Sequence, residues 1–231
     1  PTAAAHRLPG PRSHVRPSSH TPLLDTLASD AIPITQGTAP PLCRPSRLTI
    51  MSVNYNYINY DYFGHLNNDS YTFGNLLKDA GYATCIVGKW QLNGLAYKDE
   101  IPYWNDNNRP VDFGFDEYAL WQLTRGRNEG ERFADPLIEQ NGKILDTNID
   151  DYGPDIFTNY LLDFIDRNQK APFFVYFPMV LVHEPFVPTP DSEDWADPDL
   201  RYKNDTSYFR DMVSYTDKIV GKIVNKLETL D

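Results

Sequence analysis

The chain has 231 residues, 41% of them hydrophobic, and its formal net charge at pH 7 is −11. A chain of this size and composition can bury a core, which excludes disorder for its main part, and its acidic charge disfavours a nucleic-acid partner. Two cysteines are too few for a disulfide scaffold, and the longest apolar run, APFFVYFPMVLV, is too short for a membrane span.

Residues 1–19 differ in composition from the rest of the chain. They contain arginine, histidine and proline but no acidic residue and no apolar stretch of the signal-peptide type, so the compartment stays open. We interpret 1–19 as an atypical, disordered leader and 20–231 as part of a catalytic domain. A genuine basic tail is the alternative interpretation of the leader.

The first half of the chain predicts three helices and a strand. The segment TPLLDTLASDA offers Thr21 as N-cap and a proline in the first turn. PSRLTIMSV predicts a second helix that places Cys43 just before its N-terminus, with Asn54 as its left-handed end. TFGNLLKDAGY predicts a short helix ending near Gly81, and ATCIVGKW then has the length and composition of a strand.

The second half continues the alternation of helices and strands. GPDIFTNYLLDFIDRNQ has apolar residues at helical spacing, and PFFVYFPMVLV is apolar without alternation, as in a parallel strand covered on both faces. A last helix is predicted over 205–230. Residues 93–150 are read as loops and short strands, with an Asn-Gly hairpin in EQNGKIL.

This order of elements predicts an α/β fold, with a mostly parallel sheet flanked by helices. Ligands of such sheets bind beyond the carboxyl ends of the strands, where we place Lys89 and His183.

Cys43 stands at a predicted helix N-terminus, which attracts anions, and Arg47 follows one turn later with a planar set of donors for an oxyanion. Spacing alone leaves two other interpretations open: a thiol activated by the helix end, or a buried structural cysteine. Cys85, in mid-strand, is interpreted as a core residue.

Three segments together resemble one family. CRPSR, residues 43–47, resembles the signature Cys-x-Pro-Ser-Arg of the sulfatases, GYATCIVGKWQL resembles their second signature, and VHEPFVPTP resembles their His-x-Pro segment. The resemblance implies the alkaline-phosphatase-like fold of formylglycine-dependent, arylsulfatase-like hydrolases of sulfuric esters. Residues 20–231 would then be a partial sulfatase catalytic domain, truncated at both ends.

The resemblance also implies how the cysteine is used. A formylglycine-generating enzyme would read the maturation signal Cys43, Pro45, Ser46 and Arg47 and oxidise the cysteine to an aldehyde. One hydroxyl of the hydrated aldehyde attacks sulfur and expels the alcohol, and the other lets the sulfate leave.

Further roles are carried over by motif position. The resemblance implies that Arg47 and Lys89 hold the hydrated aldehyde and the sulfate oxygens, and that His183 contacts the sulfate or the leaving-group oxygen. Gln91 replaces the usual histidine of the second signature; it would bind substrate by a hydrogen bond but cannot donate a proton at neutral pH. The catalytic set is therefore Cys43, Arg47, Lys89 and His183, and the substrate-binding set is Lys89, Gln91 and His183.

Sulfatases generally bind Ca²⁺, and the formylglycine at position 43 would be one ligand. The remaining carboxylate and amide ligands are expected upstream of Thr21 and beyond Asp231, and neither set occurs in this sequence.

The leading hypothesis is a sulfatase-family hydrolase of sulfate esters, impaired by the missing metal ligands, for which a sulfated carbohydrate is a candidate substrate. A non-catalytic remnant that binds sulfated ligands is the alternative, and a phosphatase or phosphodiesterase is disfavoured because those enzymes use Ser or Thr with zinc. Tyr103, Trp104 and Trp121 would suit a carbohydrate surface, although packing explains each of them.

We expect this chain to bind Ca²⁺ poorly, because a hard cation needs several oxygen ligands and the expected carboxylates are missing. Calorimetric titration of the chain with CaCl₂ checks this, and tight binding would contradict it.

Overall fold

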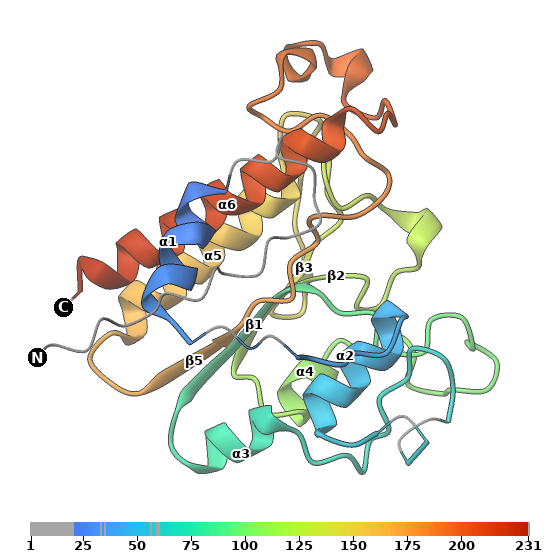
Figure 1. Ribbon diagram of the computed structural model, residues 1–231. Helices are drawn as coiled ribbons and strands as arrows, with labels where there is room; N and C mark the ends of the chain where they lie inside the picture. The colour runs from blue at the N-terminus through green and yellow to red at the C-terminus, as the bar shows by residue number, and fades with distance from the viewer. Residues whose placement is uncertain (1–20, 33, 35, 56, 59–60, 231) are drawn as a thin grey trace, which may run out of the picture.

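The computed structural model describes residues 21–32, 34, 36–55, 57–58 and 61–230 (Figure 1). The predicted leader, 1–19, lies outside the described residues. In the described part, no helix combines the length and apolarity that crossing a bilayer requires. The helices are α1 (Pro22–Asp30), α2 (Cys43–Ser52), α3 (Phe73–Asp79), α4 (Arg109–Asp112), α5 (Gly153–Asn168) and α6 (Tyr208–Glu228), with 3₁₀ turns η1 (Arg127–Glu129), η2 (Glu193–Ala196) and η3 (Pro198–Leu200).

A sheet in the order β4-β3-β2-β1-β5 forms the centre of the described chain. Its three longest strands are parallel, with β1 between β2 and β5, while β3 and β4 form an antiparallel hairpin beside β2. This confirms the predicted α/β fold with a mostly parallel sheet. The hairpin turns at Asn141 and Gly142, both with positive φ, as the Asn-Gly pair predicts. The strands are β1 (Ala83–Lys89), β2 (Glu117–Trp121), β3 (Glu139–Gln140), β4 (Lys143–Ile144) and β5 (Phe173–Tyr176).

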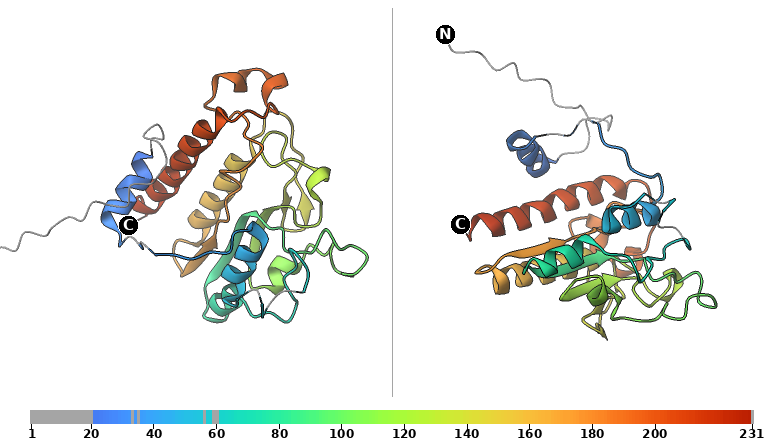
Figure 2. Two further views of the ribbon diagram at one scale, coloured as in Figure 1. Left: turned by 45° about the vertical axis from the view of Figure 1, so that its right-hand side comes forward. Right: turned by 90° about the horizontal axis from the view of Figure 1, so that it is seen from below.

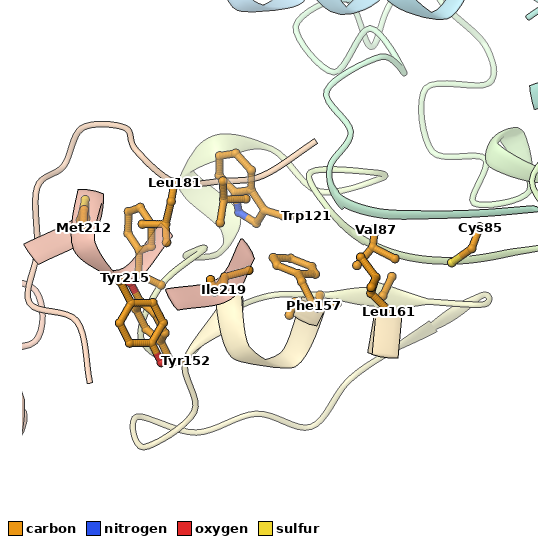
Figure 3. Close-up of a cluster of buried hydrophobic side chains, with 14 of the residues drawn as sticks. Cys85, Val87, Trp121, Tyr152, Phe157, Leu161, Leu181, Met212, Tyr215 and Ile219 are labelled. Carbon is orange, nitrogen blue, oxygen red and sulfur yellow. The ribbon is translucent and has the colours of Figure 1, made fainter. Parts of the chain in front are cut away.

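Helices lie on both sides of the central strands (Figures 1 and 2), and a cluster of buried apolar side chains lies on each side of the sheet. Cys85 and Val87 of β1 point to the side of α5 and α6, where they join Phe157 and Leu161 in the cluster of Figure 3. Ile86 points the other way, toward α2, α3 and α4. A strand buried on both faces needs an unbroken apolar run, which explains why ATCIVG lacks alternation. Cys85 is fully buried, as predicted for a core residue.

The strand predicted in PFFVYFPMVLV differs from expectation. β5 covers only Phe173–Tyr176, and all four residues are half-buried, because β5 lies at the edge of the sheet rather than inside it. The chain continues beyond Tyr176 without strand structure, so His183 does not stand at a strand end. The segment 93–150, read as loops and short strands, contributes the parallel strand β2 next to β1.

Helix α2 begins two residues earlier than its proline suggested. Leu42 is the N-cap and Cys43 is the first helical residue, so the cysteine lies inside the helix rather than before it. At the other end, the left-handed residue is Val53, with φ 57°, and not the predicted Asn54. Its N–H donates to the carbonyl of Thr49 at 2.9 Å.

Helix α1 is held by α6. Thr21 is the N-cap, as predicted, but its hydroxyl makes no capping bond. The carboxylate of Asp217, which is 3% exposed, accepts the N–H groups of Leu23 at 3.2 Å and Leu24 at 2.8 Å instead. A carboxylate from α6 therefore satisfies the N-terminal donors of α1.

Replacing Val53 by glycine should stabilise the chain. A β-branched residue in the left-handed region is strained, so Val53→Gly should raise the free energy of unfolding by about 1 kcal/mol. Ile50→Gly, an exposed interior position of α2, should lower it by about 0.5 kcal/mol. Urea unfolding measures both, and a destabilised Val53→Gly variant would contradict the assignment.

Candidate active site at the carboxyl end of the central strands

Cys43 is exposed at the first turn of α2, and its Sγ lies 3.9 Å from Oε1 of Gln91. The neighbouring motif residues are used within the fold. Pro45 is buried, and the hydroxyl of Ser46 donates to the carbonyls of Pro40 and Leu42, each at 2.8 Å. The cysteine is thus the member of this turn that remains available for chemistry.

Arg47 connects α2 to the end of β1. Its Nε donates to the carbonyl of Trp90 at 3.0 Å, and one terminal nitrogen donates to the carbonyl of Lys89. Burial lowers the pKa of its guanidinium, with interactions from Tyr176 and Cys43 opposing the shift. These contacts fix Cys43 relative to the strand end; contact of Arg47 with substrate stays a prediction.

Lys89 is the last residue of β1, as predicted, and it is buried. Its backbone N–H donates to the carbonyl of Pro178 at 2.9 Å, and its Nζ lies 5.9 Å from the ring centroid of Trp121. No carboxylate pairs with it among the described residues. Burial, followed by the charges of Arg47, Arg132 and Arg44, lowers the pKa of Lys89 to about 8, although Cys43 raises it.

His183 lies beside an arginine that sequence reasoning missed. Its Nδ1 is 2.6 Å from the carbonyl oxygen of Glu184 and 3.1 Å from a terminal nitrogen of Arg132, which also donates to that carbonyl. Arg132 is 5% exposed and stacks with its Cζ 4.9 Å from the ring centroid of Trp121. Burial first, then the positive charges of Arg132 and Lys89, lower the pKa of His183. No motif marks Arg132, so only the fold reveals it.

Gln91 lies just past β1 and pairs with Gln122, the residue after β2. The Nε2 of Gln91 donates to Oε1 of Gln122, and its backbone N–H donates to the backbone carbonyl of Gln122 at 3.1 Å. Its side-chain carbonyl faces Cys43. The structure therefore brings Gln91 to the cysteine and adds Gln122 as an unpredicted partner, while substrate binding by Gln91 stays a prediction.

The candidate site residues interact electrostatically with one another. Cys43 interacts with Arg47, Lys89 and Arg132, and Arg132 and Lys89 in turn interact with His183. The four predicted catalytic residues therefore share one neighbourhood with Arg132 and Arg44. We call the set Arg44, Arg47, Lys89 and Arg132 the cationic cluster. Such a surplus of buried positive charge next to an exposed thiol suits a tetrahedral oxyanion.

A cavity of about 700 Å³ adjoins the cluster at Arg132. Its size lies in the range of small-molecule sites. The lining is mainly polar, with two arginines, several carboxylates and amides, and the aromatic rings of Trp121 and Tyr202. The lining residues are Trp121, Arg127, Asn128, Glu129, Gly130, Glu131, Arg132, Asp135, Glu184, Pro185, Tyr202 and Asn204.

The described residues do not form a metal-binding group. Within 21–230, apart from the few positions left undescribed, no three His, Cys, Asp or Glu side chains cluster so that they could hold an ion. Cys43, the ligand expected from the resemblance, is surrounded by cations instead. The side chains of the described residues therefore do not fit a calcium site.

Comparisons with known proteins agree on one family. A family model described as Sulfatase matches residues 11–231. The chain is 29% identical over 175 residues to the N-acetylglucosamine-6-O-sulfatase of Bacteroides thetaiotaomicron, covering 74% of this chain and 27% of the relative. It is 34% identical over 122 residues to the human steryl-sulfatase, covering 47% of this chain and 20% of that enzyme.

A solved structure, described as BT4656 in complex with its substrate D-glucosamine-2-N,6-O-disulfate, superposes with a TM-score of 0.58. It is 27% identical, and the match covers 74% of this chain and 31% of that one. The chain thus spans about a quarter of the length of the curated relatives above.

Sulfate binding should weaken as pH rises. Between about pH 7 and about pH 9 the positive charge of Lys89 is lost, because its pKa is about 8, and affinity for inorganic sulfate should fall about tenfold. The pKa of Arg132 is about 10 and that of His183 lies below its ordinary value, so the charges of these two groups change mainly outside this window.

Calorimetric titration with sodium sulfate at the two pH values measures the effect. Lys89→Met should bind weakly at both, while Lys170→Met, at an exposed lysine, should keep the pH dependence. Equal affinity of the unmodified chain at both pH values would contradict the role of Lys89.

Proposed function

The chain belongs to the sulfatase family, and on that premise we propose that it takes part in hydrolysis of sulfate esters, with a sulfated carbohydrate as substrate. The observation that supports this most strongly is the cationic cluster around Cys43. A sulfate ester carries one negative charge, and charge builds up on its oxygens as the S–O bond is cleaved. Fixed cations in a partly water-free site stabilise that charge without reorganising.

The proposal requires oxidation of Cys43 to formylglycine. When formed, its hydrate supplies one hydroxyl that attacks sulfur and a second that releases the sulfate. The maturation signal is Cys43, Pro45, Ser46 and Arg47. Pro45 and Arg47 are buried in the folded chain, so a formylglycine-generating enzyme would have to read the signal before α2 docks against β1.

Each cation has a defined place in the proposal. Lys89 interacts electrostatically with residue 43 and is assigned to the sulfate oxygens, while Arg47 fixes the helix that carries residue 43. Arg132 lines the cavity and acts electrostatically on Lys89, so it adds positive charge next to the cavity, to which we assign the alcohol part of the substrate. Gln91 contributes a hydrogen bond and no proton.

His183 is assigned to proton transfer at the leaving-group oxygen. Its Nδ1 lies within hydrogen-bond distance of the Glu184 carbonyl oxygen, and if it donates there, Nε2 is left for the substrate side. Because burial, followed by neighbouring cations, lowers the pKa of His183, its imidazolium is a stronger acid than an ordinary one and gives its proton readily to an alkoxide.

The cavity beside Arg132 supports a carbohydrate over a steroid. Hydroxyl groups of a sugar can be held by the carboxylates and amides of its lining, and its two aromatic rings provide surfaces for the sugar ring. A steroid would leave those polar groups without partners. Relatives acting on N-acetylglucosamine and glucosamine sulfates fit this preference.

The family is consistent with a metal cofactor, and calcium is the ion implied by the resemblance. Because the described residues do not fit a calcium site, the roles above contain no metal step.

Co-expression with a formylglycine-generating enzyme tests the proposal. Mass spectrometry should find an aldehyde at position 43 and an unmodified thiol at the buried Cys85. Sulfate release from N-acetylglucosamine 6-sulfate should be slow, because the expected metal ligands are missing, but should still exceed phosphate release from the corresponding phosphate ester. Cys43→Ala should lower sulfate release by at least about 10³-fold, whereas Cys43→Ser should stop after one turnover. A thiol that persists in a host that matures another sulfatase favours the non-catalytic alternative.

A further inference from the structure

Two glutamines occupy matching places past the ends of β1 and β2. Gln91 and Gln122 have φ values of 58° and 56°, in the left-handed region that non-glycine residues rarely adopt. Both are buried, at 9% and 2% exposure. The backbone of Gln91 donates to that of Gln122 at 3.1 Å, so the two strands stay paired beyond their assigned ends. Strained backbone of this kind persists where the surroundings enforce it.

Their side-chain amides form a chain that ends at Cys43. Gln122 presents Oε1 to Nε2 of Gln91, and the other end of the Gln91 amide, Oε1, lies 3.9 Å from the Sγ of Cys43. The buried Nε2 of Gln122 has no hydrogen-bond partner among the described residues. With the Gln122 carbonyl turned toward Gln91, the NH₂ group of Gln122 is therefore left without an acceptor.

The orientations of two facing amides are coupled. If Gln122 offers its carbonyl, Gln91 must turn its NH₂ toward it and its own carbonyl toward residue 43. If Gln122 offered its NH₂, Gln91 would turn its NH₂ toward residue 43. A carbonyl accepts a hydrogen bond from a thiol or hydroxyl, whereas an NH₂ group donates to an anion.

We propose that Gln122 is a positioning residue that fixes the Gln91 amide so that its carbonyl oxygen accepts a hydrogen bond from the side chain at position 43, which keeps its proton. For the unmodified chain that proton belongs to the thiol. In the context of the proposed function, it belongs to a hydroxyl of the hydrated aldehyde, whose orientation Gln91 would set without taking the proton. Gln91 thus contributes orientation, and proton transfer is left to another group.

Alkylation of Cys43 by iodoacetamide at neutral pH tests this on the chain as it exists, whether or not it hydrolyses sulfate esters. Gln122→Met keeps the side-chain length but frees the Gln91 amide, which can then donate to the thiolate. Its Cys43 should react about fivefold faster, a change equivalent to one net hydrogen bond. Gln122→Glu retains an acceptor for Gln91, so its Cys43 should react no faster than that of the unmodified chain.

Peptide mass spectrometry supplies the controls. Cys85 is fully buried, so its protection from alkylation shows that each variant is folded. Gln140→Leu, on β3 of the same sheet, should leave the Cys43 rate unchanged. A Gln122→Met rate within about twofold of the unmodified chain, with Cys85 protected, would overturn the proposal. Faster alkylation of Cys43 in Gln122→Glu than in the unmodified chain would also overturn the proposal. This second outcome can be tested even if Gln122→Met fails to fold.

Discussion

The site depends on one buried guanidinium. Arg47 belongs to the helix that presents Cys43, and it donates to the carbonyls of Lys89 and Trp90, where the central strand ends. Those carbonyls would otherwise lie unpaired in an apolar layer, and the guanidinium would be a buried charge without partners. The hydrogen bonds between the guanidinium and the two carbonyls therefore offset the desolvation cost of burying all three groups. The distances between the thiol, the lysine and the glutamine amide depend on this link.

Around it, the side chains of the cationic cluster form no ion pair with a carboxylate in the part of the chain that the structure describes. Arg132 is kept in place by Trp121 and by the Glu184 carbonyl, and Lys89 by its strand. Like charges repel, and the lowered pKa of Lys89, due mainly to burial, also reflects repulsion by Arg47, Arg132 and Arg44. The fold thus stores an unfavourable arrangement that an oxyanion would relieve, which is a common property of functional sites.

The sequence predicts the parts of this arrangement that have local signals. Caps and apolar runs indicate α2 and β1, and the family resemblance implies a role for Lys89 at position 43. β2 was missed because EYALW is short and lies in a stretch rich in polar residues, and its place beside β1 is a long-range pairing. β5 was expected to be fully buried, since apolarity does not reveal which strand lies at an edge. Arg132 and Gln122 carry no local mark, because their partners lie on other elements.

The capping of α1 by Asp217 has a consequence for the order of assembly. The two hydrogen bonds link Asp217 to Leu23 and Leu24, which precede it by 194 and 193 positions in the chain. Closing so long a loop is entropically unfavourable until the sheet and its helices have formed. Helix α1 buries none of its residues and so has little else to hold it. It should dock last during folding and detach first in denaturant, while the sheet is still intact.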